Sequence, residues 1–144
     1  MLGIDVTGPV QTPELLEDER IVDLARLRRD HAAAVALYRQ CIHLWHEREE
    51  NTELLQPLEG LAGALNARGQ PEQAVRIWGF AETWRRVLDT PRAPYHTDNY
   101  ARAVSAARLT LGEAPFETEW SQGADMDPSQ AIAYALHDPP TLHG

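Results

Sequence analysis

The chain has 144 residues and a formal net charge of −9, with 13 basic residues, all of them arginine, against 22 acidic ones. Hydrophobic residues make up 43% and charged residues 24%, which is typical of a globular protein. The acidic balance disfavours contact with phosphate backbones, so we expect no direct binding of nucleic acid, and no apolar run reaches the roughly 18–20 residues of a membrane helix, so we expect no membrane contact.

The N-terminal half predicts two helical hairpins over residues 13–90, preceded by a flexible arm over residues 1–12. In the first hairpin, a helix over residues 13–29 precedes a second helix that Asp30 would cap. The second helix carries an apolar stripe at helical spacing and is expected to fade near Asn51.

The second hairpin begins with a predicted helix over residues 52–68. Pro57 lies inside this range, so the helix either starts late, near Gln56, or is kinked at the proline. Gly69 would end it and Pro71 would open the next helix. That fourth helix has the strongest stripe in the chain, formed by Ala74, Ile77, Trp78, Ala81, Trp84 and Leu88.

Residues 91–137 are expected to cap the array, and residues 138–144 to form a disordered tail. The helices predicted in the cap cover residues 95–111, 114–122 and 128–136. Asp127 and Gln130 have the spacing of a capping box at the start of the last one. Because no segment alternates with period two, the sequence predicts an all-α fold of about seven helices.

Two segments 40 residues apart match each other. Ala34, Val35, Leu37, Tyr38, Cys41 and Leu44 align with Ala74, Val75, Ile77, Trp78, Ala81 and Trp84. Self-similarity at such a period is the signature of stacked repeats, which usually bind other molecules. The small–aromatic–small spacing resembles the second helix of the tetratricopeptide repeat, and its positions here are Ala34, Tyr38 and Cys41, then Ala74, Trp78 and Ala81.

A longer resemblance covers residues 58–136, from LEGLAGALNARGQPEQAVRIWGF to DPSQAIAYAL. This stretch is similar to the C-terminal end of large bacterial transcriptional regulators of the NTPase and LuxR type, which join an NTPase, a tetratricopeptide-like array and often a helix-turn-helix domain. The resemblance implies an array terminus that senses or scaffolds. The chain shows no GxxxxGK[ST] loop and no recognisable DNA-binding helix pair.

The resemblance also implies a partner-binding surface, because the first helices of tetratricopeptide hairpins build the concave face. The positions selected in this way are Asp23, Arg26, Glu59, Gly63 and Asn66. The leading hypothesis is therefore a non-enzymatic module that binds a protein or peptide in bacterial regulation. An equally weighted reading makes these five ordinary surface residues.

The alternative function is a small-molecule sensor, with an aromatic pocket ringed by Trp84, Tyr95 and Tyr100. Cys41, His43 and His46 have a spacing in which a metal site can be imagined, but a solvated helix face is the favoured explanation, so we expect no metal and no cofactor. No catalytic constellation is legible in the sequence, so we expect no enzymatic activity.

Two hairpins are fewer repeats than such arrays usually need, and an uncapped end exposes apolar surface. We therefore expect a homodimer through the first two helices, with Trp45 among the contacts. The single cysteine and the lack of a recognisable signal peptide favour a cytoplasmic location.

Overall fold

The computed structural model describes residues 30–49 and 51–137, and no strand occurs among them. The elements are α3 (His31–Glu47), the 3-10 helix η1 (Asn51–Leu54), α4 (Leu55–Ala67), α5 (Pro71–Leu88), α6 (Pro94–Leu111), α7 (Glu113–Ala124) and α8 (Pro128–Leu136). The predicted all-α class is confirmed. The arm, the helix predicted over residues 13–29 and the tail lie outside the described residues.

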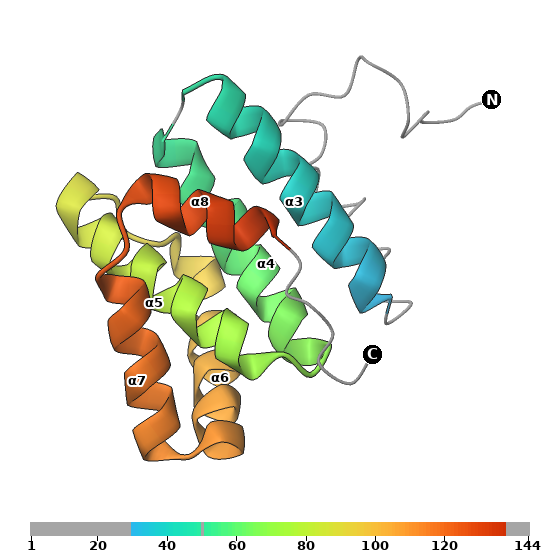
Figure 1. Ribbon diagram of the computed structural model, residues 1–144, viewed down its shortest axis with the longest axis vertical. Coiled ribbons are helices and arrows are strands. Elements are labelled where there is room, and N and C mark those ends of the chain that lie inside the picture. Colours follow the sequence, from blue (N-terminus) through green and yellow to red (C-terminus); the bar gives the residue numbers. More distant parts are fainter. Residues whose placement is uncertain (1–29, 50, 138–144) are drawn as a thin grey trace.

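Helix α5 lies at the centre of the fold and packs against α4 and α7, with further contacts to α6 and α8 (Figure 1). The short connection at residues 68–70 folds α5 back along α4. Helices α6 and α7 form a hairpin of their own within the predicted capping region, joined at Gly112. Helix α8 then returns across the molecule to contact α3 and α5.

Two helices begin with the caps that the sequence predicts. The Asp30 carboxylate accepts a hydrogen bond from the backbone N–H of Ala33, at 3.0 Å, and so satisfies one free donor of α3. Before α8, the Asp127 carboxylate accepts from the Gln130 N–H at 2.8 Å, and the Gln130 side chain accepts from the Asp127 N–H at 2.9 Å. This reciprocal pair is the predicted capping box.

The end and the beginning of α4 follow from a glycine and a proline. Gly69 has a φ of 90°, and Gln70 donates its N–H to the Leu65 carbonyl at 2.9 Å, which closes the helix in a Schellman motif. Pro57 is the third residue of α4, a position at which a backbone N–H would have no partner within the helix, so the proline removes no helical hydrogen bond. The helix therefore starts late, at Leu55, and is preceded by a 3-10 turn.

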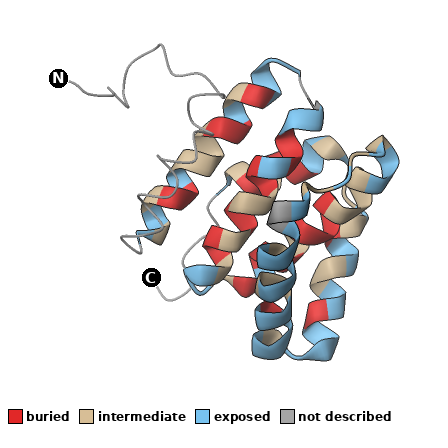
Figure 2. Cartoon of the chain, turned by 180° about the vertical axis from the view of Figure 1, so that it is seen from behind, coloured by how far each residue is buried: buried red, intermediate tan, exposed pale blue. Residues whose placement is uncertain are grey.

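The two matching segments lie in α3 and α5, and both helices carry buried residues that contribute to the core (Figure 2). Of the six small–aromatic–small positions in these two helices, five are buried: Ala34, Cys41, Ala74, Trp78 and Ala81. Tyr38, the sixth, is half-buried and lies against Gly60 of α4, where a Cβ would overlap its ring. Trp45, expected at a dimer contact, is only 5% exposed and belongs to the core of the described chain.

One of the aligned positions that differ between the two segments determines which helix packs against each of them. In α3 it is Arg39, whose Nε donates to the Ala135 carbonyl of α8 at 2.9 Å. In α5 it is Gly79, where an added Cβ would overlap the backbone of Trp120 in α7. Gly123 of α7 is packed in the same way against the carbonyl of Arg76. Glycine at both places lets α5 and α7 touch backbone to backbone.

Replacing Gly123 by alanine is expected to destabilise the protein by about 2–3 kcal/mol, because the new methyl group overlaps backbone that cannot rotate away. The matched control is Gly63→Ala in α4, where no described atom lies within 4 Å of the added Cβ. There we expect a gain of about 0.5–1 kcal/mol from helix propensity. Urea unfolding followed by circular dichroism measures both, and equal effects of the two changes would contradict the close α5–α7 contact.

Candidate functional site

The predicted partner-binding positions of α4 lie on one helical face, since Glu59, Gly63 and Asn66 are spaced i, i+4 and i+7. Gly63 and Asn66 are half-exposed. The Glu59 side chain is 11% exposed and is engaged with other parts of the chain. Asp23 and Arg26 lie outside the described residues. The structure therefore brings three of the five positions together, with Glu59 turned inward to the fold.

Glu59 is the centre of a buried ion-pair cluster that joins α4 to α5. Arg85 of α5 holds its carboxylate with two hydrogen bonds, from Nε at 2.8 Å and from a terminal nitrogen at 2.9 Å. The same guanidinium also donates to the carbonyl of Thr90, just after α5, at 2.8 Å. This two-pronged arrangement fixes both the distance and the angle between the partners.

Arg92, in the connection between α5 and α6, extends the cluster to α6. It donates to Glu59 and, at 3.0 Å, to Glu82 of α5. Its guanidinium lies over the ring of Tyr100, 3.5 Å from the centroid, and the Tyr100 hydroxyl donates to Glu82 at 3.2 Å. The connection is therefore bound to α4, α5 and α6 at once, which fixes the start of α6 against the core.

The electrostatics of the cluster favour its charged form. Burial raises the pKa of Glu59, but the hydrogen bonds and charges of Arg85 and Arg92 outweigh it, so the pKa lies below its ordinary value of 4.5. Burial likewise lowers the pKa of Arg92, and Glu59 and Glu82 more than reverse this. The pKa of Tyr100 is raised by burial and by the charge of Glu82, so the phenol stays protonated and donates.

Tyr100 links this cluster to a groove between α6 and α7. Its ring packs edge-on against Trp78 at 6.2 Å. It also lines an open cavity of about 370 Å³, whose walls are Tyr100, Ala101, Val104, Ser105, Arg108, Phe116, Glu117 and Trp120. We call this cavity the α6–α7 groove. Its floor is largely aromatic, because Phe116 and Trp120 stack at 5.6 Å beside Tyr100 and Val104.

One rim of the groove carries charges that are paired with each other. Arg108 of α6 lies 4.3 Å from the centre of the Phe116 ring. Its guanidinium is 3.3 Å from Glu113 and 3.5 Å from Glu117 of α7. All three charged side chains are about half exposed or more. Two carboxylates therefore share one guanidinium at the opening.

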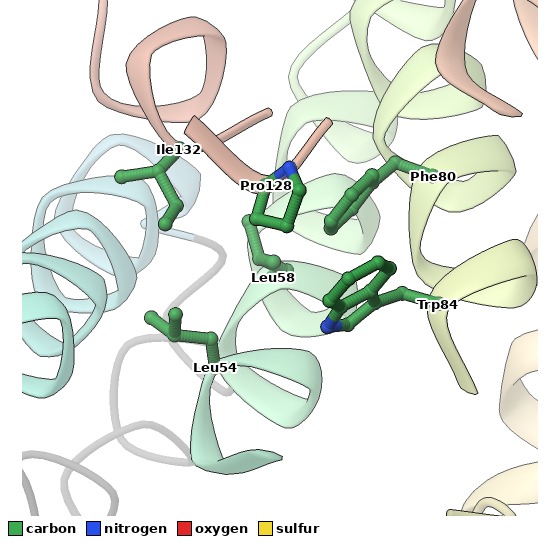
Figure 3. Close-up of a pocket in the computed structure, with 6 residues that line it drawn as sticks. All are labelled: Leu54, Leu58, Phe80, Trp84, Pro128 and Ile132. Carbon is green, nitrogen blue, oxygen red and sulfur yellow. The ribbon is translucent and has the colours of Figure 1, made fainter. Parts of the chain in front are cut away.

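The predicted aromatic ring of Trp84, Tyr95 and Tyr100 is not assembled as one pocket. Trp84 stacks on Phe80 and lines a separate small cavity with Leu54, Leu58, Pro128 and Ile132 (Figure 3). That cavity measures about 10 Å³, the size of a single water molecule at most. Tyr100 faces the α6–α7 groove instead, and the side chain of Tyr95 is outside the described part of the structure.

The remaining residues considered from sequence have ordinary surroundings. Cys41 is buried on the core side of α3. His43, exposed on the same helix, pairs with Glu47 at 3.2 Å. Within residues 30–49 and 51–137, no group of three or more potential metal ligands is found, and no described helix is long and apolar enough to cross a membrane.

Sequence reasoning did not identify the α6–α7 groove that Phe116 and Trp120 line. The signal was present on α6, where Ala101, Ser105 and Arg108 are spaced i, i+4 and i+7 beside the inward stripe. The groove depends on how far α6 and α7 diverge. The contacts that place the two helices on the core include those at Gly79 and Gly123 and the ion pairs of Glu59, and local periodicity does not encode such contacts between residues far apart in the sequence.

Comparison with known proteins gives one group of relatives. The chain is 31% identical over 109 residues to proteins of Mycobacterium tuberculosis strain H37Rv and Mycobacterium bovis that are provisionally named HTH-type transcriptional regulators. The match covers 76% of this chain but 12% of each relative, so the chain spans a small part of their length. No protein-family model matches the chain, and no solved structure gives a significant match.

This similarity agrees with the resemblance to bacterial transcription regulators, and it corrects one expectation. On the basis of the formal charge of −9, the sequence predicted no direct binding of nucleic acid. The relatives are named for the helix-turn-helix, a motif that places a helix in the major groove of DNA. The expectation was therefore wrong, because the net charge of a chain does not decide whether proteins like it contact DNA through one local motif.

Replacing Glu59 by glutamine should destabilise the protein by about 3 kcal/mol at pH 7, because Arg85 and Arg92 lose a buried counter-charge. Glu47→Gln, in an exposed pair, is the matched control and should cost less than about 1 kcal/mol. Since the folded pKa of Glu59 is lowered, its contribution is complete above pH 4.5 and is lost as the pH falls toward the folded pKa.

Urea unfolding of the parent and the Glu59→Gln variant between pH 7 and pH 3 measures this effect. The difference in unfolding free energy between the two proteins should shrink below pH 4.5. A difference that stays constant down to pH 3 would show that the carboxylate of Glu59 does not supply the stabilisation.

Proposed function

We propose that this chain is a non-enzymatic, tetratricopeptide-like helical module that binds a protein or peptide partner in a bacterial transcription regulator of the cytoplasm. The observation that carries the proposal is the α6–α7 groove, an open cavity of about 370 Å³ with an aromatic floor. The similarity to mycobacterial proteins named as transcriptional regulators supports the regulatory setting.

The composition of the groove supports this proposal. Tyrosine, tryptophan and arginine are the residues most often found at the energetic centres of protein interfaces, and the groove supplies Tyr100, Trp120 and Arg108. Leu109, next to Arg108 on α6, is 86% exposed and adds apolar surface nearby. These side chains offer a partner both apolar contact and a charged rim.

The groove is also held in shape before any partner arrives. Tyr100 is fixed by Glu82 and Arg92, and Trp120 lies where the backbone of α7 meets Gly79 of α5. A preformed surface loses less conformational freedom on binding than a mobile one, which favours affinity. On this reading Glu59 supports the binding surface from inside the fold, whereas Gly63 and Asn66 remain candidates for direct contact on α4.

A second candidate function is the sensing of a small molecule in the same groove. The observation that favours it is the cavity volume, which lies within the range of about 300–1,000 Å³ typical of small-molecule sites. Its walls combine aromatic rings with a serine hydroxyl and two charged groups. A low-molecular-weight ligand would be recovered with the protein purified from the source bacterium, and mass spectrometry would detect it.

Site-specific photo-crosslinking tests the partner-binding proposal. A benzophenone amino acid is placed at Ser105, an exposed residue at the groove, in the protein as its bacterium expresses it. The control position is Val87 on α5, which is 63% exposed and does not line the groove. We expect a discrete protein adduct from position 105 and none of that mass from position 87.

The possible results separate the alternatives. The same adducts from both positions would show contact without a site and would contradict the proposal. An adduct with nucleic acid alone, or no macromolecular adduct together with a co-purified small molecule, would also contradict it, and the latter result would favour the sensor.

A further inference from the structure

We infer that the α6–α7 groove binds a basic amphipathic helix, which presents apolar side chains to the groove floor and lysine or arginine to its rim. This inference rests on the proposed function and names the kind of partner. Three features of the described residues carry it: the shape of the groove, the small side chains on one edge, and the excess of negative charge at the opening.

The shape suits a third helix laid along the hairpin. On α6 the lining positions Ala101, Val104 and Arg108 follow helical spacing over two turns, and on α7 Phe116 and Trp120 are one turn apart. The groove therefore runs between two helices, as in complexes where an amphipathic helix inserts its apolar face between a pair. The edge formed by Ala101 and Ser105 has small, exposed side chains, so a partner helix can approach the α6 backbone closely.

The charge at the opening selects the sign of the partner. Glu113 and Glu117 share the single guanidinium of Arg108, which leaves one excess negative charge at the rim. Arg108 itself lies over the ring of Phe116 beside these carboxylates, so the protein already shows that a guanidinium is accommodated there. An incoming arginine or lysine can pair with the exposed carboxylates of Glu113 and Glu117.

The buried ion-pair cluster around Glu59 adds no net positive charge near the groove. Glu59 and Glu82 face Arg85 and Arg92, two carboxylates against two guanidinium groups. The whole chain carries a formal charge of −9, which attracts a basic partner over distance. A second copy of the chain carries the same acidic charge, so charge complementarity favours a different, basic partner.

Two synthetic helical peptides of about 18 residues test the inference on the full chain. Both carry the same leucine face, and the polar face is lysine in one and glutamate in the other. We expect the lysine peptide to bind at least about tenfold more tightly at low salt, as measured by fluorescence anisotropy. This preference should diminish in about 0.5 M sodium chloride, because exposed charges are screened.

Matched variants locate the binding. Ser105→Trp fills the groove and should weaken binding of the lysine peptide by about tenfold or more, whereas Ala106→Trp, exposed on the same helix outside the lining, should change it by less than about twofold. The Glu113→Gln, Glu117→Gln double variant should weaken the lysine peptide about three- to tenfold and spare the glutamate peptide. Circular dichroism checks that every variant is folded.

Each outcome has a separate meaning. Equal effects of the two tryptophan variants, or no effect of Ser105→Trp, would show that the peptide binds outside the groove and would overturn the inference. Equal or stronger binding of the glutamate peptide would overturn it as well. A protein adduct at Ser105 in the crosslinking experiment would still support the proposed function in these cases, so the failure of the two ideas can be told apart.

Discussion

The backbone contact between α5 and α7 is the constraint on which the rest of the structure depends. Gly79 and Gly123 have no side chains, so α7 lies directly on α5. At each glycine the backbone of the other helix leaves no room even for a methyl group. Once α7 is fixed there, the stacked rings of Phe116 and Trp120 are held beside α6. Asp127 caps the start of α8 directly after α7, and α8 returns to α3, where Arg39 donates a hydrogen bond to the Ala135 carbonyl. The floor of the groove and the closure of the array thus follow from one close approach.

The ion-pair cluster supplies the second constraint, because it fixes α6 from the other side. Glu59 binds Arg85 and Arg92 in a space that water scarcely reaches, with side chains that are 10–11% exposed. Buried charges of this kind often add little net stability relative to apolar packing, but leaving one unpaired is costly. Their value here is geometric, since only one position of the α5–α6 connection satisfies every partner. The cluster also fixes one wall of the groove, because the Tyr100 ring that packs against Arg92 lines the groove as well.

Much of the fold was predictable because its signals are local. Asp30, Gly69 and the Asp127–Gln130 pair act within one turn of their own position, and the structure confirms all three. Long-range features were not predictable in this way. Glu59 has the spacing of a surface residue, and its burial depends on arginines 26 and 33 residues further along the chain. Trp84 and Tyr100 share an aromatic character, yet their helices direct them into different cavities.

The distribution of charge explains why net charge was a poor guide to partners. Arg76, Arg85 and Arg92 are largely occupied in pairs with glutamates inside or beside the fold, so they contribute little field at the surface. The exposed carboxylates of the described surface include Glu113 and Glu117 at the groove, which share one guanidinium. Recognition responds to this local potential over about 8–10 Å in physiological salt, and charges beyond that distance are screened. A formal charge of −9 summed over the whole chain therefore does not describe the charge at any one surface, such as the groove, where Glu113 and Glu117 share the guanidinium of Arg108.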